Sequence, residues 1–193
     1  RRAEPIPVYA EMSSINPVFL LPAALEARAE ALGAAYVGSV TMGAGQFCTN
    51  PGLVLAVEGP ALDRFLTAAA EAMGTAPAAT MLSPGIHKAY ESGVARMASA
   101  PALKLLAEGS EPGGPTCGQP ALFTIAAKDF IADAEHAEEV FGAASMVIRC
   151  GDVEEMLGVI GHLEGQLTAT MHLDAGDHDL AARLVPLLER KVG

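Results

Sequence analysis

Cys48 is the residue of this chain best suited to covalent chemistry. It stands in the run Gly43–Gly52, where a thiol follows a glycine-rich turn and precedes the apolar, strand-like stretch Leu53–Val57. Glycine lets a backbone approach a ligand closely, and peptide N–H groups near a thiol can stabilise a developing oxyanion. Cys48 is therefore a candidate nucleophile. The alternative is that it is a small hydrophobic residue of the core, as many free cysteines are.

Glu11 is the candidate general base. A cysteine that forms a thioester needs a second group to activate the water that releases the acid. Glu11 follows the apolar stretch Pro7–Ala10, which we expect to be a strand. A carboxylate among small and apolar neighbours loses hydration, which raises its basicity. The competing interpretation is a solvated turn residue.

The elements that must position these residues follow an α/β pattern. Short apolar runs alternate with helical periodicity along the chain, which predicts a largely parallel sheet flanked by helices, in a single domain spanning residues 1–193. The expected strands are Pro17–Leu21, Leu53–Val57, Leu103–Ala107, Ala121–Ala126, Ser145–Cys150 and Leu167–His172. The expected helices are Pro22–Gly33, Ala34–Met42, one beginning at Pro60, Pro84–Ala98, Asp152–Glu164 and His178–Lys191.

Composition excludes several classes of partner. The 12 Lys and Arg against 23 Asp and Glu give a formal net charge of -11, which repels nucleic acid and anionic lipid surfaces. No apolar run approaches the roughly 20 residues that cross a bilayer. Three widely separated cysteines favour a reducing cytoplasm, and no Cys or His spacing indicates a metal site. We therefore expect neither nucleic acid, nor a membrane, nor a metal.

Three segments together resemble a known family. Pro5–Pro17 contains Glu11, Gly45–Gly52 contains Cys48, and Glu138–Gly142 follows in the last third of the chain. Their order and approximate spacing resemble the aldehyde dehydrogenase superfamily. The first two segments are most similar to its α-ketoglutaric semialdehyde (2,5-dioxovalerate) dehydrogenase branch. The resemblance extends over essentially the whole chain, but only over the catalytic domain of the family.

The resemblance implies a role for four residues. Cys48 matches the nucleophile that attacks the aldehyde and later holds the acyl group as a thioester, and Glu11 matches the base that activates water for deacylation. Glu139 matches the acidic residue that binds the ribose next to the nicotinamide of NAD or NADP. Phe141 matches the aromatic residue that packs near the nicotinamide ring. These residue types suit the tasks, because carboxylates accept hydrogen bonds from hydroxyls and aromatic faces pack against flat rings.

The sequence also departs from the family pattern. Ser13, Ser14 and Ile15 stand where many members have two glycines and a lysine, and Ala143 stands where proline is common. The first departure fits the semialdehyde branch, whereas the second affects the turn on the cofactor side. The family's nucleotide-binding domain precedes the segment that resembles residue 1, so we expect the isolated chain to be a fragment that binds NAD(P) weakly and turns over slowly or not at all.

The resemblance implies that the full-length parent oxidises a small-molecule aldehyde, namely α-ketoglutaric semialdehyde, to 2-oxoglutarate and is a homo-oligomer. Two other functions remain open. One is a cofactor-independent cysteine hydrolase or acyltransferase that pairs Cys48 with one of five histidines. The other is a non-catalytic, structural fragment in which Cys48 is inert. The sequence leaves the choice between NAD and NADP open.

Overall fold

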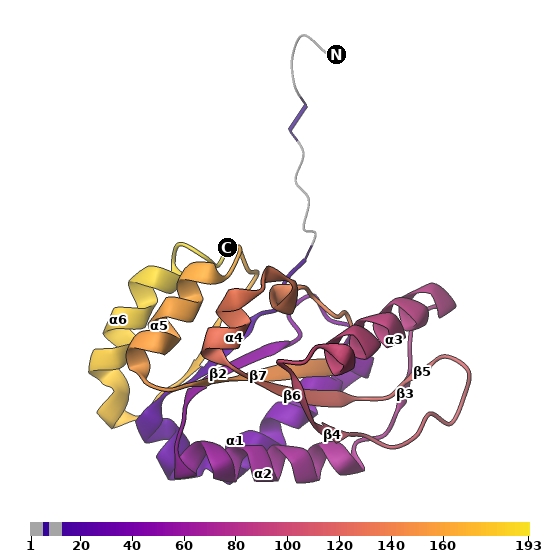
Figure 1. The fold of residues 1–193 in the computed structure, drawn as a ribbon, viewed down its shortest axis with the longest axis horizontal. Coiled ribbons are helices and arrows are strands. Elements are labelled where there is room, and N and C mark those ends of the chain that lie inside the picture. The colour runs from indigo at the N-terminus through magenta and orange to yellow at the C-terminus, as the bar shows by residue number, and fades with distance from the viewer. Residues whose placement is uncertain (1–5, 8–12) are drawn as a thin grey trace.

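The computed structural model describes residues 6–7 and 13–193, and within these residues a six-stranded sheet has the order β4-β6-β7-β2-β1-β8 (Figure 1). Five strands run parallel to their neighbours, and β4 pairs antiparallel with β6. The strands are β1 (Pro17–Leu20), β2 (Leu53–Val57), β4 (Lys104–Glu108), β6 (Ala121–Ala126), β7 (Ala144–Cys150) and β8 (Thr170–His172). The predicted α/β class with a mostly parallel, helix-flanked sheet is confirmed.

Helices cover both faces of this sheet. On one face lie α1 (Pro22–Thr41) and α2 (Pro60–Thr75), and on the other lie α4 (Ala127–Ala132), α5 (Val153–His162) and α6 (His178–Leu188) (Figure 1). The helix α3 (Pro84–Ser99) lies beside a small antiparallel pair, β3 (Ala79–Thr80) with β5 (Cys117–Gly118). Short 3-10 segments complete the fold: η1 (Met42–Gly45), η2 (Ala134–Ala137) and η3 (Ala175–Asp177).

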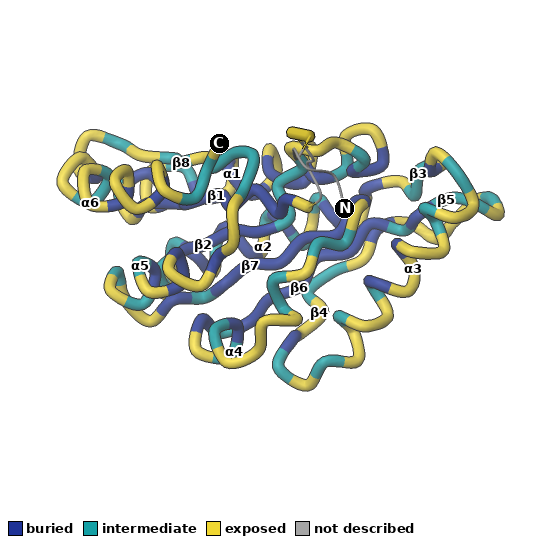
Figure 2. Tube along the Cα trace, turned by 90° about the horizontal axis from the view of Figure 1, so that it is seen from above, coloured by how far each residue is buried: buried dark blue, intermediate teal, exposed yellow. Residues whose placement is uncertain are grey.

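Side chains that point alternately to the two faces of the sheet divide the core into two parts. In β1, Val18 and Leu20 pack with α1 and α2, whereas Phe19 packs with α5 and α6. Successive side chains of a strand point to opposite faces, so a strand covered on both sides is apolar throughout. The central strands β1, β2, β6 and β7 accordingly appear mostly buried in Figure 2, whereas the helices carry many exposed residues.

The two helices expected over Pro22–Gly33 and Ala34–Met42 form the single helix α1, so the predicted break at Gly33 was wrong. A side chain on Gly33 would place its Cβ only 2.7 Å from the Phe65 carbonyl oxygen of α2. The glycine therefore allows the two helices to approach closely and does not end α1. The irregular backbone lies earlier, at Arg28, with φ -150° and ψ 33°.

Other predicted boundaries shift by a few residues. Strand β8 begins at Thr170 and not at Leu167, and α6 ends at Leu188 and not at Lys191. The short helix α4 was not predicted. The expected strand Pro7–Ala10 falls largely outside the described residues. Among the helices that the structure describes, none has the length and apolarity needed to cross a membrane.

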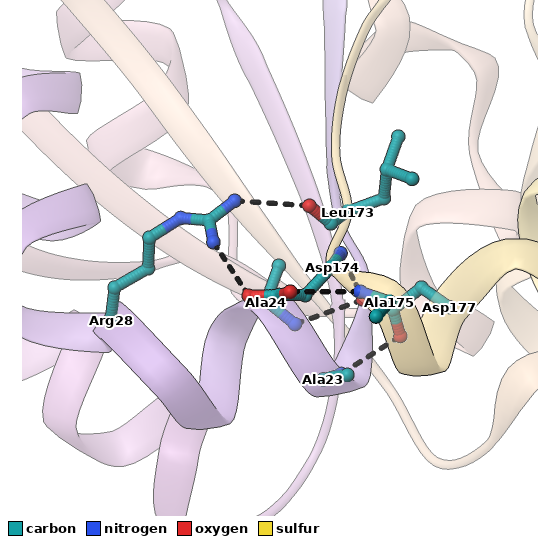
Figure 3. A network of polar contacts seen from close by, with 7 residues as sticks. All are labelled: Ala23, Ala24, Arg28, Leu173, Asp174, Ala175 and Asp177. Carbon is teal, nitrogen blue, oxygen red and sulfur yellow. Dashed lines mark hydrogen bonds and ion pairs between the residues drawn. The ribbon is translucent and has the colours of Figure 1, made fainter.

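The start of α1 is held by a residue far along the chain. Leu21 at its N-cap position contributes no side-chain hydrogen bond, and the buried carboxylate of Asp177 accepts the N–H groups of Ala23 and Ala24 at 2.8 and 2.9 Å (Figure 3). A carboxylate at a helix N-terminus satisfies otherwise unpaired N–H groups and interacts favourably with the helix dipole. Arg28 adds an ion pair with Asp174 at 3.0 Å, which links α1 to the same turn.

Three loops meet at the amino-terminal edge of the parallel strands. The register pairs Pro17 of β1 with Leu53 of β2, and Leu53 with Met146 of β7, so these strands begin side by side. The segment after Glu11 enters β1, the Cys48 loop enters β2, and the Glu138–Gly142 segment leads to β7. The fold thereby brings together segments that are far apart in the sequence.

Candidate active site

The Cys48 loop begins with a left-handed turn. Gly43, Ala44 and Gly45 of η1 have φ values of 57°, 58° and 68°. Positive φ is readily adopted by glycine but is uncommon for alanine. Cys48 follows in a turn closed by a 3.0 Å bond from the Asn50 N–H to the Phe47 carbonyl, and the thiol residue is exposed. The nucleophile predicted from the sequence is therefore accessible.

Gly45 allows the Cys48 loop to pack directly against the segment that carries Phe141. A Cβ on Gly45 would lie 2.2 Å from the carbonyl carbon of Gly142, which is closer than any real contact. Gly142 itself has φ 148°, and a Cβ there would lie 2.3 Å from the ring of Tyr90. Backbone therefore packs on backbone at this point, and neither position has room for a side chain.

Two asparagines connect the three loops. Asn50 Nδ2 donates to the Gly142 carbonyl at 3.0 Å, which joins the Cys48 loop to the Phe141 segment. Asn16 Nδ2 donates to the carbonyls of Cys48 and Asn50 at 3.0 and 2.9 Å, which joins the same loop to the segment following Glu11. Glu11 itself lies outside the described residues, so its role stays a prediction.

Buried hydroxyl groups hold the end of the loop. The Pro51 carbonyl lies 2.9 Å from the Tyr36 hydroxyl and 3.0 Å from the Ser145 hydroxyl, and these two hydroxyls also contact each other. Burial raises the pKa of Tyr36 well above its usual value, so its phenol stays neutral and able to donate. The loop is thus fixed both at its turn and where it enters β2.

Glu139 lines a cavity of about 700 Å³ between the segment after Glu11 and the segment before Phe141. Ser13, Ile15 and Gln166 form one side of it, and Glu138 and Glu139 form the other. Its volume is in the range of small-molecule sites, which span roughly 300 to 1,000 Å³. The acidic side chains offer acceptors for hydroxyl groups, so this cavity suits part of a ribose-containing cofactor.

The structure places Glu139 and Phe141 on the same side of the site. Both line a narrow gap of about 30 Å³ together with Asn50 and Gly142, and Phe141 is 38% exposed. Cys48 lines neither cavity and is exposed. Over residues 6–7 and 13–193, no three His, Cys, Asp or Glu side chains are grouped to hold a metal ion.

The comparison with known families agrees with this arrangement. The model of the aldehyde dehydrogenase family matches residues 2–172, which include all three loops. The chain belongs to the aldehyde dehydrogenase family. The predicted family membership is confirmed.

Two curated relatives lie in one branch of the aldehyde dehydrogenase family. The chain is 51% identical over 192 residues to alpha-ketoglutaric semialdehyde dehydrogenase 2 of Azospirillum brasilense, and 40% identical over 193 residues to alpha-ketoglutaric semialdehyde dehydrogenase of Acinetobacter baylyi. In both comparisons the match covers 100% of this chain and 37% of the relative. The chain thus spans a little over a third of the length of these relatives.

Solved structures of aldehyde dehydrogenases share the fold. A NAD-dependent benzaldehyde dehydrogenase from Corynebacterium glutamicum superposes with a TM-score of 0.69 over 89% of this chain and 37% of its own, at 18% identity. An indole-3-acetaldehyde dehydrogenase in complex with NAD+ gives 0.71 over 95% of this chain and 37% of its own, at 21% identity. The shape of this part of the family is thus retained at low identity.

The residues that join the loops were not identified as site residues from the sequence. Asn16 and Asn50 are the only asparagines of the chain, and each precedes a proline at the entrance to a strand. Asn-Pro is a turn signal, and that signal points to both positions. It does not reveal that their side chains bridge separate loops of the folded chain.

Proposed function

We propose that this chain carries the nucleophile and the water-activating base of an NAD(P)-dependent aldehyde dehydrogenase. The observation that supports this most is the meeting of three loops at the edge of β1, β2 and β7: the exposed Cys48, the segment following Glu11, and the segment of Glu139 and Phe141. The names of the two curated relatives support α-ketoglutaric semialdehyde as the substrate and 2-oxoglutarate as the product.

The chemistry assigned to the chain begins at the sulfur of Cys48. The Cys48 thiolate attacks the aldehyde carbonyl carbon, and the carbonyl oxygen becomes the oxyanion of a thiohemiacetal. No hydrogen bond among the described residues uses the N–H of Cys48 or Thr49, so these groups are available to an oxyanion. NAD(P)+, when bound, would supply the hydride acceptor that oxidation of the thiohemiacetal to a thioester requires.

Glu11 acts in the second half of the reaction. Its carboxylate takes a proton from water, the resulting hydroxide attacks the thioester carbonyl, and the C–S bond breaks to release the acid and the Cys48 thiolate. Glu139 would accept hydrogen bonds from the cofactor ribose, and Phe141 would lie against the nicotinamide. The aldehyde and water are thereby converted to carboxylic acid: two electrons and one proton leave as hydride, and the proton taken up by Glu11 is released to solvent.

We further propose that residues 1–193 form one catalytic domain of a longer enzyme, since the chain spans only 37% of its curated relatives. The homo-oligomeric state of that enzyme is proposed from the family resemblance alone. The cofactor-independent hydrolase is the weaker candidate. Among the described residues, no hydrogen bond joins a histidine to the Cys48 thiol. A cysteine hydrolase needs a general base within hydrogen-bond reach of its nucleophile.

The test is made in the full-length enzyme. Cys48→Ala removes the nucleophile and should abolish NAD(P)-dependent oxidation, whereas Cys117→Ala should leave it unchanged. Glu11→Gln should retain a burst of NAD(P)H formation and lose steady-state turnover, because the thioester forms but is not hydrolysed. Glu71→Gln, on the exposed surface of α2, is the matched control. Normal steady-state turnover in Cys48→Ala or Glu11→Gln would refute the assignment.

A further inference from the structure

The side chain of Asn16 bridges two carbonyls of the Cys48 loop. Its Nδ2 donates to the Cys48 oxygen at 3.0 Å and to the Asn50 oxygen at 2.9 Å, so both N–H bonds of the amide are used. Asn16 is 3% exposed, so water does not compete for these bonds. The amide therefore joins two carbonyls of the same turn, those of Cys48 and Asn50, which lie two positions apart.

The orientation of this amide is fixed by its other end. Asn16 Oδ1 accepts from the Thr168 N–H at 3.3 Å, the Thr168 hydroxyl at 3.1 Å and the Ser14 hydroxyl at 2.7 Å. The Thr168 N–H can only donate and the two loop carbonyls can only accept. Turning the amide over would face donor to donor and acceptor to acceptor, so the arrangement has one allowed orientation.

The backbone of Asn16 is held as firmly as its side chain. Gln166 Oε1 accepts the N–H groups of Ile15 and Asn16 at 2.7 and 3.0 Å, and the Ser14 hydroxyl accepts the Leu167 N–H at 2.9 Å. Asn16 has φ 46°, a left-handed conformation that asparagine tolerates better than most residues. The segment following Glu11 is thereby anchored on Gln166–Thr168.

A fixed carbonyl at Cys48 restricts where the thiol can lie. Because a peptide unit is planar, holding the Cys48 oxygen fixes the plane of the Cys48–Thr49 peptide and restricts the Cα–Cβ direction of the cysteine. In the trans peptide the Thr49 N–H points opposite to that oxygen, so the same bond also sets the direction of this donor. Asn16 lies five positions after Glu11, in the segment that carries the candidate base.

We propose that Asn16 is a positioning residue that aligns the Cys48 sulfur for attack on the carbonyl, a role that rests on the proposed function. A displacement of about 1 Å at a reacting atom lowers rates by about 100-fold. Loss of the two donors should therefore lower kcat about 100-fold, while the KM values for aldehyde and NAD(P) change less than about threefold, since binding contacts are retained.

Asn16→Asp in the full-length enzyme tests this directly. Aspartate keeps the size, the Oδ1 acceptor and the tolerance of positive φ, but it presents a second acceptor to the two carbonyls. Gln119→Glu is the matched control, because it removes a 2.8 Å bond from an amide to the Gly109 carbonyl on a different loop. Thr168→Ser keeps the hydroxyl that orients Asn16, whereas Thr168→Val removes it.

Two readouts separate positioning from a general loss of structure. The first is steady-state kinetics, in which kcat should fall while KM changes little, and the rate of the NAD(P)H burst should fall along with kcat. The second is deuterium exchange at the amides of residues 46–52, which should be about tenfold faster in Asn16→Asp. The exchange rate of the β2 amides and the alkylation rate of Cys117 should stay unchanged. A purely structural role would instead speed exchange in β2 and expose Cys117 and Cys150 to alkylation.

The outcomes are distinct. The proposal is supported if Asn16→Asp lowers kcat and speeds exchange only in residues 46–52. It further requires that kcat is near normal in Thr168→Ser and Gln119→Glu and intermediate in Thr168→Val. Turnover of Asn16→Asp within threefold of the parent, or unchanged exchange in the loop, overturns it. A parent enzyme without NAD(P)-dependent oxidation contradicts the proposed function instead. The exchange measurement needs no turnover, so it then decides whether Asn16 holds the loop.

Discussion

Asn50 and Gly142 join the loop of the candidate nucleophile to the segment of the candidate cofactor residues. Asn50 Nδ2 donates to the Gly142 carbonyl at 3.0 Å, across 92 positions of sequence. Phe141 precedes this glycine directly, and Glu139 lies two residues before Phe141. We therefore expect a change at Asn50 to alter the position of the segment that contains Glu139 and Phe141.

Replacing Asn50 with alanine should weaken cofactor binding in the full-length enzyme. A lost hydrogen bond of this kind is worth about 1 kcal/mol, which corresponds to about a fivefold higher dissociation constant for NAD(P). Calorimetric titration of the parent and of Asn50→Ala measures this constant. An unchanged constant would show that the bond does not position Glu139 and Phe141.

Gly45→Ala should destabilise the fold strongly. The substitution combines a positive φ of 68° with a Cβ 2.2 Å from the Gly142 backbone, and strain and overpacking together should cost about 3 kcal/mol. Gly38→Ala is the matched control, because its Cβ meets no described atom within 4 Å and α1 should gain up to about 1 kcal/mol. Urea unfolding measures both. Equal stabilities would contradict the close packing of the two loops.

Asp177→Asn should loosen the start of α1. The carboxylate accepts from the N–H groups of Ala23, Ala24 and Asp174, and the amide cannot accept as many bonds or interact with the helix dipole as a charge. We expect a loss of about 1 to 2 kcal/mol in the free energy of unfolding. Asp179→Asn, on the exposed first turn of α6, should change it by less than about 0.5 kcal/mol. Equal effects would mean that Asp177 does not cap α1.

Stability should fall with rising pH above about 9, partly because of Cys150. Burial, followed by the coulombic effects of nearby carboxylates, raises the pKa of the Cys150 thiol from its usual value of 9.0 to about 12. Between these values the unfolded chain has lost a proton that the folded chain retains, so the free energy of unfolding decreases as pH rises.

Cys150→Ala removes this contribution, so its stability should decline less steeply than that of the parent between pH 9 and 10. Urea unfolding at closely spaced pH values measures the two slopes. The buried phenols of Tyr36 and Tyr90, whose pKa values are also raised, remain in both proteins. Identical slopes would show that the thiol does not titrate as its burial implies.

The parallel core could be predicted from the sequence because its strands are locally encoded. β2, β6 and β7 are short apolar runs bounded by turn residues, and burial on both faces gives them no polar alternation to misread. The continuation of α1 through Gly33 could not be predicted, because the residue that explains this glycine, Phe65 of α2, is distant in sequence. The same local signal, a lone glycine, indicates either a helix end or a close approach.

The candidate nucleophile could be found from its motif, but the residues that position it could not. Cys48 stands among glycines that indicate a turn. Asn16 is held by Gln166 and Thr168, which lie 150 and 152 positions away, and such contacts exist only in the folded chain. The same contacts explain why β8 begins at Thr170 and not at Leu167. Gln166 and Thr168 bind the segment before β1 and do not extend the strand.

The central claim is that Cys48 carries the acyl group between hydride transfer and hydrolysis. The most direct measurement mixes full-length Glu11→Gln enzyme with α-ketoglutaric semialdehyde and NAD(P)+, quenches it with acid, and locates the added mass by peptide mass spectrometry. We predict an acyl adduct on Cys48 that forms only with NAD(P)+ and is absent from the Cys48→Ala, Glu11→Gln double variant. An adduct on Cys117 or Cys150, or no cofactor-dependent adduct, would contradict the account.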